Sequence, residues 1–177
     1  MPTSNLAELL SEYAQRYPAE QDVVQRFVEL MQNYTNCYDR NCWAGHITGS
    51  AWVLNVAGDA VLLTHHRKLG IWVQLGGHSD GDPDTAAVAL KEAEEESGLR
   101  VTALEPRIFD LDIHAIPARK GDPEHFHFDV RFAFQAAADN FVVSEESLDL
   151  AWVPIQTLED YTQELSMLRM RDKWLNR

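Results

Sequence analysis

The stretch that most constrains this chain covers residues 76–99. It opens with two glycines and continues into a segment whose composition favours a helix. Asp82 is a good N-cap, Pro83 suits the first helical position, and Gly98 can end a helix in the left-handed conformation. The pattern predicts a glycine loop that leads into a capped helix over residues 83–97.

The last turns of this predicted helix carry three carboxylates, Glu92, Glu95 and Glu96. Their spacing of i, i+3 and i+4 puts them on one face, where like charges repel. Lys91 is the only cation within the helix. A solvated helix surface would tolerate such a cluster. A hard divalent cation would relieve the repulsion, because carboxylate oxygens are its preferred ligands.

Together these features resemble the Nudix box: Gly, five residues, Glu, seven residues, Arg-Glu, an apolar residue, any residue, Glu-Glu, any residue, Gly and an apolar residue. The chain matches this pattern at Gly77, Glu92, Ala93, Glu95, Glu96, Gly98 and Leu99. It departs from it twice, because Lys91 replaces the arginine and Pro83 stands where the first glutamate belongs. Proline cannot bind a metal ion, although Asp82 and Asp84 flank it.

The resemblance covers about residues 45–174 and implies an α/β fold, a Nudix-type α/β/α sandwich on a mixed sheet. It implies a Mg²⁺- or Mn²⁺-dependent hydrolase that cleaves a diphosphate linkage in a nucleoside diphosphate linked to another moiety. Glu92, Glu95 and Glu96 would be the metal ligands and catalytic residues. One of them, or another carboxylate of the cleft, would act as the general base.

Four residues are candidates for binding this small-molecule diphosphate. The backbone at Gly76 and Gly77 can approach a ligand closely, because no Cβ intervenes. Arg67 belongs to a basic cluster, His-His-Arg-Lys, and would hold a phosphate bidentately unless that loop is simply solvated. Arg131, on a strand rich in phenylalanine, would look into the cleft in the Nudix layout.

Another four residues form a candidate second metal site: His46, His78, His127 and Asp129. Their local contexts are similar to those of a histidine-rich metal site in isopentenyl diphosphate isomerase, which shares the Nudix fold. Three imidazoles and a carboxylate suit Zn²⁺, Mn²⁺ or Fe²⁺ better than Mg²⁺. The alternative is that these side chains hydrogen-bond the substrate.

Two other functions therefore stay open beside hydrolysis. One is an enzyme like isopentenyl diphosphate isomerase, although glycines precede His78 where that family has its catalytic cysteine. The other is a non-catalytic nucleotide-binding Nudix domain, which the departures at Pro83 and Lys91 suggest. Fold alone does not decide between these functions.

The residues before the Nudix-like region show a different pattern. Apolar residues recur at helical spacing over residues 4–36, with an interruption at Pro18. This predicts a helical extension over residues 1–44, followed by a Nudix-like catalytic domain over residues 45–177. The apolar stripes would pack on the sheet or on a second subunit, so a homodimer is one expectation, and a substrate lid is the alternative role for these helices.

Alternation of apolar and polar residues predicts most of the sheet. We expect a hairpin of residues 47–56 and 60–64, strands over 101–115, 125–135 and 148–153, a loop over 117–123, and a closing helix over 155–174. In the strand over 125–135 the phenylalanines would face the core and the ionisable residues the cleft.

The formal charge of -13 argues against nucleic acid as a partner, because the protein surface would repel its phosphates. Cys37 and Cys42 are too few for a disulfide framework, so free thiols in a reducing cytoplasm are expected. No apolar run approaches the roughly 20 residues that cross a bilayer. We therefore expect a cytoplasmic protein without a membrane partner.

Overall fold

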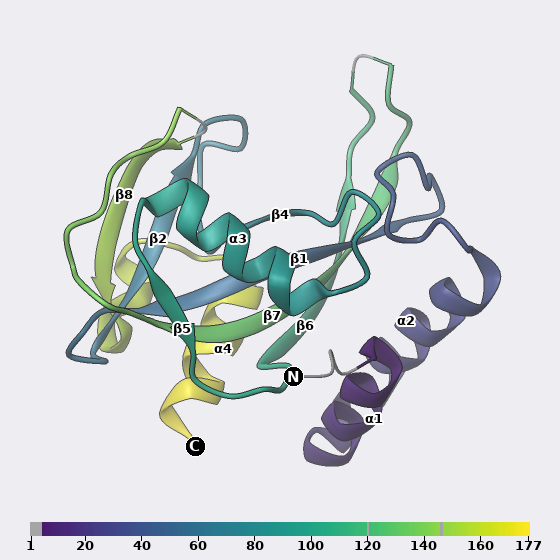
Figure 1. The fold of residues 1–177 in the computed structure, drawn as a ribbon, viewed down its shortest axis with the longest axis horizontal. Helices are drawn as coiled ribbons and strands as arrows, with labels where there is room; N and C mark the ends of the chain where they lie inside the picture. The colour runs from purple at the N-terminus through teal and green to yellow at the C-terminus, as the bar shows by residue number, and fades with distance from the viewer. Residues whose placement is uncertain (1–4, 120, 146) are drawn as a thin grey trace.

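Eight strands and one helix lie between His46 and Pro154 in the computed structural model, which describes residues 5–119, 121–145 and 147–177 (Figure 1). The elements are α1 (Leu6–Arg16), the short 3₁₀ helix η1 (Pro18–Glu20), α2 (Gln21–Asn33), β1 (His46–Leu54), β2 (Ala60–His66), β3 (Trp72–Val73), β4 (Leu75–His78), α3 (Thr85–Ser97), β5 (Val101–Ala103), β6 (Asp110–Ile116), β7 (His125–Ala136), β8 (Ser147–Pro154), the 3₁₀ helix η2 (Ile155–Asp160) and α4 (Leu165–Leu175). No helix within these described ranges has the length and apolar character needed to span a bilayer.

The strands form one eight-stranded sheet. Its main path runs β3-β2-β1-β7-β5, while β4 pairs with β1, β6 with β7 and β8 with β2. The long central strands β1 and β7 run parallel from the pair His46 and His127 to the pair Leu54 and Gln135, and the other pairs are antiparallel. The predicted mixed sheet is therefore confirmed.

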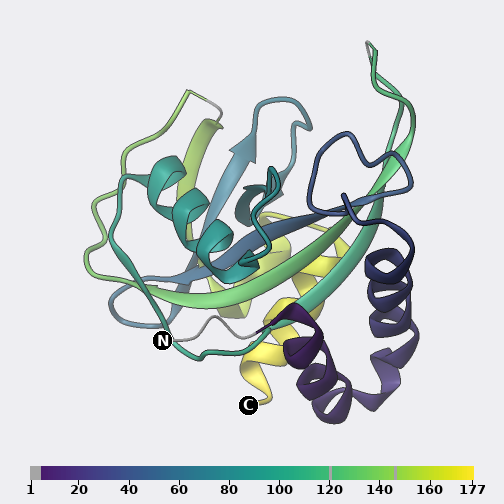
Figure 2. The same cartoon turned by 45° about the vertical axis from the view of Figure 1, so that its right-hand side comes forward.

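Strand β1 shows how the layers form, because all nine of its residues are buried and successive side chains point to opposite faces. Ala51 and Val53 belong to a hydrophobic cluster that includes Ala89 of α3. Trp52 and Leu54 belong to a second cluster with residues of η2 and α4. The sheet thus lies between α3 on one face and η2 with α4 on the other (Figure 2), which confirms the predicted α/β/α sandwich.

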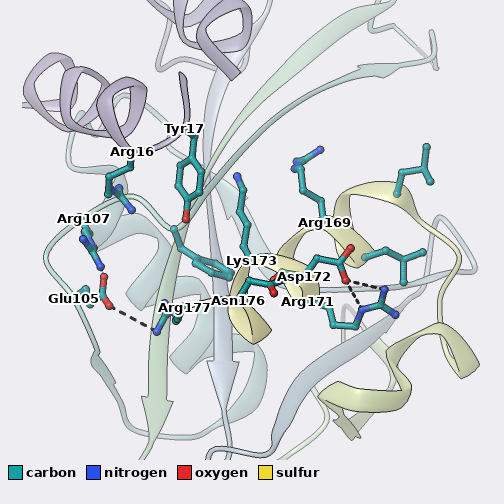
Figure 3. A pocket seen from close by; sticks show the side chains of 13 residues that line it. Arg16, Tyr17, Glu105, Arg107, Arg169, Arg171, Asp172, Lys173, Asn176 and Arg177 are labelled. Atoms are coloured by element: carbon teal, nitrogen blue, oxygen red, sulfur yellow. Dashed lines mark hydrogen bonds and ion pairs between the residues drawn. The ribbon is translucent and has the colours of Figure 1, made fainter. Parts of the chain in front are cut away.

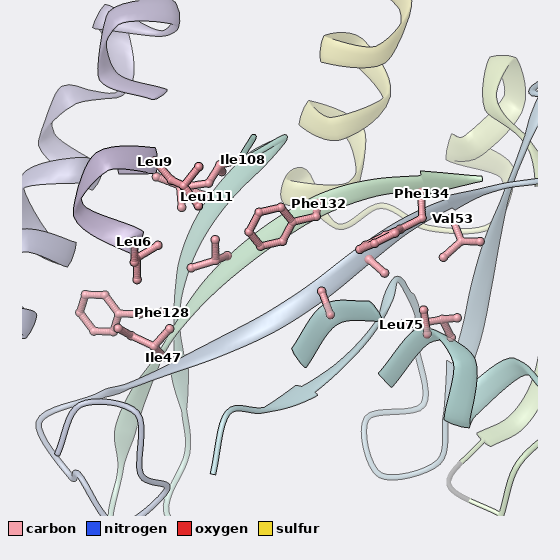
Figure 4. Close-up of a cluster of buried hydrophobic side chains, with 14 of the residues drawn as sticks. Leu6, Leu9, Ile47, Val53, Leu75, Ile108, Leu111, Phe128, Phe132 and Phe134 are labelled. Atoms are coloured by element: carbon pink, nitrogen blue, oxygen red, sulfur yellow. The ribbon is translucent and has the colours of Figure 1, made fainter. Parts of the chain in front are cut away.

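The N-terminal helices pack against the sheet beside β6. Leu6 and Leu9 of α1 share one buried cluster with Phe128 of β7 (Figure 4). Phe27 of α2 meets Phe128 edge to face, with ring centroids 5.2 Å apart. The apolar stripes expected in this region therefore contact the sheet. A domain boundary after residue 44 and a homodimer both stay predictions.

Some element boundaries differ from expectation. The helix expected over residues 155–174 is divided into η2 and α4, with a non-helical backbone at Thr157 (φ -124°, ψ 31°). The strand expected over residues 101–115 is divided into β5 and β6. Ser4, at the start of the expected helical region, and Lys120, in the expected loop, lie outside the described residues.

Helix α3 begins two residues later than predicted, and its N-cap is Asp84 instead of Asp82. The Asp84 side chain accepts the backbone N–H of Ala87 at 3.0 Å. Asp82 accepts the backbone N–H of Asp84 at 2.9 Å and so supports the turn before the helix. Gly98 ends the helix with φ 70°, the left-handed conformation that the sequence predicts.

We expect Asp84→Ala to lower the free energy of unfolding by about 1 kcal/mol, because the amide of Ala87 loses its partner at the helix N-terminus. Asp82→Ala should cost less, since its bond lies outside the helix. Urea unfolding of the two variants measures both effects. A larger loss in Asp82→Ala would contradict the assignment of the cap.

Candidate functional site

The double glycine lies in β4, directly against helix α3. A Cβ at Gly77 would lie 2.5 Å from the carboxyl carbon of Glu92, and one at Gly76 would lie 2.2 Å from Oγ of Ser50. A Cβ at either position would require a neighbouring group to move. The backbone N–H of Gly76 donates to Oε1 of Glu96 at 2.9 Å. The two glycines therefore let the strand backbone approach two carboxylates of the helix.

The three box glutamates have different surroundings. Glu92 lies against Gly77, and Glu96 is 8% exposed with its bond to β4. Glu95 is mostly solvent-exposed and lies 3.9 Å from Nζ of Lys91. This separation is at the limit of an ion pair, so Lys91 restrains Glu95 only weakly. Carboxylates on successive turns of one helix form a donor set that fits a hard cation such as Mg²⁺ or Mn²⁺.

We expect Gly77→Ala to fold but to lose activity. The added methyl group meets only the end of the flexible Glu92 side chain, so that carboxylate must move. Displacing a catalytic group by about 1 Å can lower turnover roughly a hundredfold. Gly76→Ala is the contrasting variant, because its methyl group also meets the backbone of Gly49 and should lower the melting temperature. Unchanged turnover in Gly77→Ala would contradict a role for Glu92.

Asp129 belongs to a buried polar network beside this junction. Its Oδ1 accepts from Thr48 Oγ1 at 2.8 Å and from Ser50 Oγ at 2.7 Å. Its Oδ2 accepts from Arg131 Nε at 2.8 Å and from Gln74 Nε2 at 3.2 Å. Burial raises the pKa of Asp129, but the charge of Arg131 and the hydrogen bonds from Arg131 and Ser50 together hold this pKa below its ordinary value. Asp129 is therefore fully engaged in hydrogen bonds.

Arg131 is the cation at the centre of the network, and its side chain is only 2% exposed. It bonds to Asp129 and Asp110, and Asp110 also pairs with Arg169 and Lys173 of α4. The expected polar face of β7 is thus buried here instead of facing an open cleft. A substrate contact through Arg131 would require it to leave these partners.

Arg67 lies in the turn after β2 and contacts the segment leading into β8. Its Nε donates to the carbonyl oxygen of Glu145 at 3.0 Å, and its Nη2 donates to that of Ser147 at 3.1 Å. Neither partner is an acidic side chain, so the charge of the guanidinium is not neutralised by these bonds. The phosphate-binding role of Arg67 stays a prediction.

Histidines from β1, β4, β6 and β7 meet at one end of the sheet. The ring centroid of His46 lies 5.2 Å from that of His78, 4.9 Å from His125 and 4.7 Å from His127. The ring of His114 lies 5.5 Å from that of His127. The structure thus brings together three of the four residues of the predicted second metal site, while Asp129 joins the buried network instead.

Sequence reasoning did not select His114 and His125 for this site. His125 is two residues before His127, so the alternation of β7 places both on one face. The strand pattern in the sequence is therefore sufficient to place His125 beside His127. His114 is brought opposite His127 by the pairing of β6 with β7. That register depends on where the intervening turn falls, which the local sequence does not specify.

Burial keeps two rings of the histidine cluster neutral. His46 is 1% exposed, and burial together with the neighbouring His78 lowers the pKa of His46 to about 4. Burial and the neighbouring His46 lower the pKa of His127 to about 3. Both rings are therefore neutral at pH 7, the form in which an imidazole nitrogen offers a lone pair. A cavity of about 470 Å³ borders the cluster and is also lined by Arg40 and Lys68.

A second cavity, of about 800 Å³, lies where α1 approaches α4 (Figure 3). It is lined by many cations, several of which pair with acidic neighbours. Arg177 pairs with Glu105, and Arg171 pairs with Asp172, as the dashed lines show. Arg169 reaches the buried Asp110. This region is thus an ion-paired junction between the two ends of the chain, and sequence reasoning did not predict it.

The structure thus combines a mixed sheet between helices with glutamates of α3 that lie against the glycine-containing strand β4. A family model, the NUDIX domain, matches residues 46–173. The chain therefore belongs to the NUDIX family. No curated protein matches the chain.

Solved structures share this fold at low sequence identity. A NUDIX-family hydrolase from Clostridium perfringens is 24% identical with a TM-score of 0.57, covering 74% of this chain and 97% of that one. An Ap4A hydrolase of C. elegans in a binary complex is 18% identical with a TM-score of 0.59, covering 73% and 95%. The NUDIX domain of Shewanella oneidensis NrtR, complexed with ADP ribose, is 16% identical with a TM-score of 0.54, covering 85% and 97%.

Proposed function

We propose that this protein hydrolyses the diphosphate linkage of a nucleoside diphosphate joined to another moiety, with a divalent cation bound at the box. The observation that carries the proposal is the contact of Gly76 and Gly77 with Glu92 and Glu96, which puts carboxylates beside backbone that a ligand can approach. The Ap4A hydrolase and the ADP-ribose-bound domain share the fold and support this substrate class.

Glu92, Glu95 and Glu96 are the proposed metal ligands. When bound there, Mg²⁺ or Mn²⁺ would neutralise charge on the diphosphate and activate a water molecule. The amide of Gly76 fixes one oxygen of Glu96, so this carboxylate is held in place before substrate arrives. One of the three glutamates, or another carboxylate of the cleft, takes the proton of the attacking water.

The remaining features of the chain fit a small-molecule substrate. A net charge of -13 opposes the binding of a phosphate polymer, whereas a single diphosphate can be bridged by the cation. We infer that Gly76 and Gly77 admit the substrate and that Arg67 reaches one of its phosphates. A cytoplasmic location is part of the same proposal.

The test is a substrate panel of ADP-ribose, dinucleotides, nucleotide sugars and nucleoside triphosphates, assayed with Mg²⁺, with Mn²⁺ and with EDTA. We expect metal-dependent cleavage of at least one nucleoside diphosphate derivative and no cleavage in EDTA. Binding of such a compound without turnover would instead identify a binding domain. Conversion without phosphate-bond cleavage would indicate isomerase-like chemistry.

A further inference from the structure

We propose that His46, His125 and His127 form a binding site for a divalent transition-metal ion, with ligands different from the glutamates of α3. Within the described residues, these three side chains each place one ligand atom within 4.8 Å of the other two. Imidazole nitrogens suit Zn²⁺, Cu²⁺, Fe²⁺ or Ni²⁺, whereas Mg²⁺ prefers oxygen. This site goes beyond the proposed hydrolysis, which requires only the box.

The sheet itself assembles the three ligands. His46 begins β1 and stands directly beside His127 in the parallel β1–β7 pair. His125 precedes His127 by two residues, so the two side chains project from the same face of β7. Backbone pairing of two central strands therefore fixes the spacing of all three rings. A site built on strands holds its ligands more precisely than one built on loops.

Backbone carbonyls orient two of the rings. Nδ1 of His46 lies 3.4 Å from the carbonyl oxygen of Cys42, and Nδ1 of His125 lies 2.8 Å from that of Pro123. A carbonyl can only accept a hydrogen bond, so Nδ1 carries the proton and Nε2 keeps its lone pair in each ring. This is the usual way in which a metal-binding histidine is oriented.

Nε2 of His46 has no hydrogen-bond partner among the described residues, although the ring is almost completely buried. A buried polar atom without a partner is costly, and a metal ion would satisfy it. Two nitrogens bound to one ion at about 2.1 Å each lie at most about 4.2 Å apart. Small side-chain rotations thus suffice to bring atoms now within 4.8 Å to bonding distance.

The surroundings leave a position for a fourth ligand. The ring of His78 lies 5.2 Å from His46 and 5.1 Å from His127 between ring centroids, and it lines the neighbouring cavity. Lys68 lines the same cavity and would attract an anion toward the ion, whereas Arg40, which also lines it, is paired with Asp80. We therefore expect a site with three fixed imidazoles and a fourth position taken by His78, water or an anionic ligand.

The experiment is a Co²⁺ titration of the purified, chelator-treated protein in excess Mg²⁺, so that the glutamates are occupied. Visible absorption reports the coordination of Co²⁺, and displacement by Zn²⁺ tests the same site. We expect about one Co²⁺ per chain in a tetrahedral environment. Because altering an outer-shell partner alone can cost 10- to 100-fold in affinity, His125→Gln and His127→Gln should each weaken Co²⁺ binding at least about a hundredfold.

Two variants serve as controls. His65→Gln changes a histidine outside the cluster, one that stacks on Trp72, and should bind Co²⁺ like the unmodified protein. Glu95→Gln should also retain Co²⁺. Circular dichroism verifies that each variant is folded. The proposal is overturned if the folded unmodified protein takes up no Co²⁺ or Zn²⁺, if both His125→Gln and His127→Gln bind normally, or if Glu95→Gln removes the signal.

Discussion

Glu95→Gln is expected to remove most of the turnover while the protein stays folded. The side chain is mostly exposed and makes one long contact, to Lys91, within the part of the chain that the structure describes, so the amide should not disturb packing. A cation ligand stabilises the transition state by several kcal/mol. Losing about 3 kcal/mol of this corresponds to a roughly hundredfold slower reaction. Steady-state kinetics with Mg²⁺, on whichever substrate the panel identifies, measures the loss.

Glu94→Gln is the matched control on the same helix. Glu94 accepts the backbone N–H of Val101 at 3.3 Å and lies 3.8 Å from Arg100, on the side that leads to β5. It stands at a position of the box where any residue is allowed, and its substitution should leave turnover within about twofold of the unmodified protein, since less than about 0.4 kcal/mol of barrier is involved. Equal activity in Glu94→Gln and Glu95→Gln would contradict a metal-binding role for Glu95.

Arg131→Met should have the largest effect on stability, lowering the free energy of unfolding by about 3–5 kcal/mol. Removing this guanidinium leaves the buried carboxylates of Asp129 and Asp110 without their central cation. Breaking one side of a buried pair costs far more than the pair contributes, because the remaining charge stays desolvated. Chemical denaturation followed by tryptophan fluorescence measures the change.

Arg40→Met is the control for this stability effect. Arg40 pairs with Asp80 at 2.7 Å, but the two side chains are 62% and 54% exposed. An exposed pair of this kind contributes at most about 1 kcal/mol. If Arg131→Met were no more destabilising than Arg40→Met, the buried network would not be a determinant of the fold.

The sequence predicted those features that depend on neighbouring residues. The glycines before α3, the end of the helix at Gly98 and the spacing of Glu92, Glu95 and Glu96 all lie within one short segment. The conformation of these features depends on residues close to one another in the sequence, so it can be predicted without knowing the strand pairing. The cap was misplaced by two residues, because Asp82 and Asp84 are equally good capping residues and only the path of the turn selects Asp84.

Features that depend on strand pairing were harder to predict. Asp129 was assigned to the histidine site, since alternation alone puts it on the same face of β7 as His127. Its partners Thr48 and Ser50 come from β1, and Gln74 stands between β3 and β4, so only the pairing of these strands brings them to it. The role of α4 in holding Asp110 could not be anticipated for the same reason.

The most direct test of the central claim, metal-dependent hydrolysis at the box, is product analysis by mass spectrometry in water enriched in heavy oxygen. With Mg²⁺ or Mn²⁺, we predict that a nucleoside diphosphate substrate yields two phosphate-containing products, one of which carries a single heavy oxygen atom on phosphorus. The label should be absent in EDTA and strongly reduced in Glu95→Gln. Substrate that binds and stays unlabelled, or is converted without uptake of heavy oxygen, would contradict the claim.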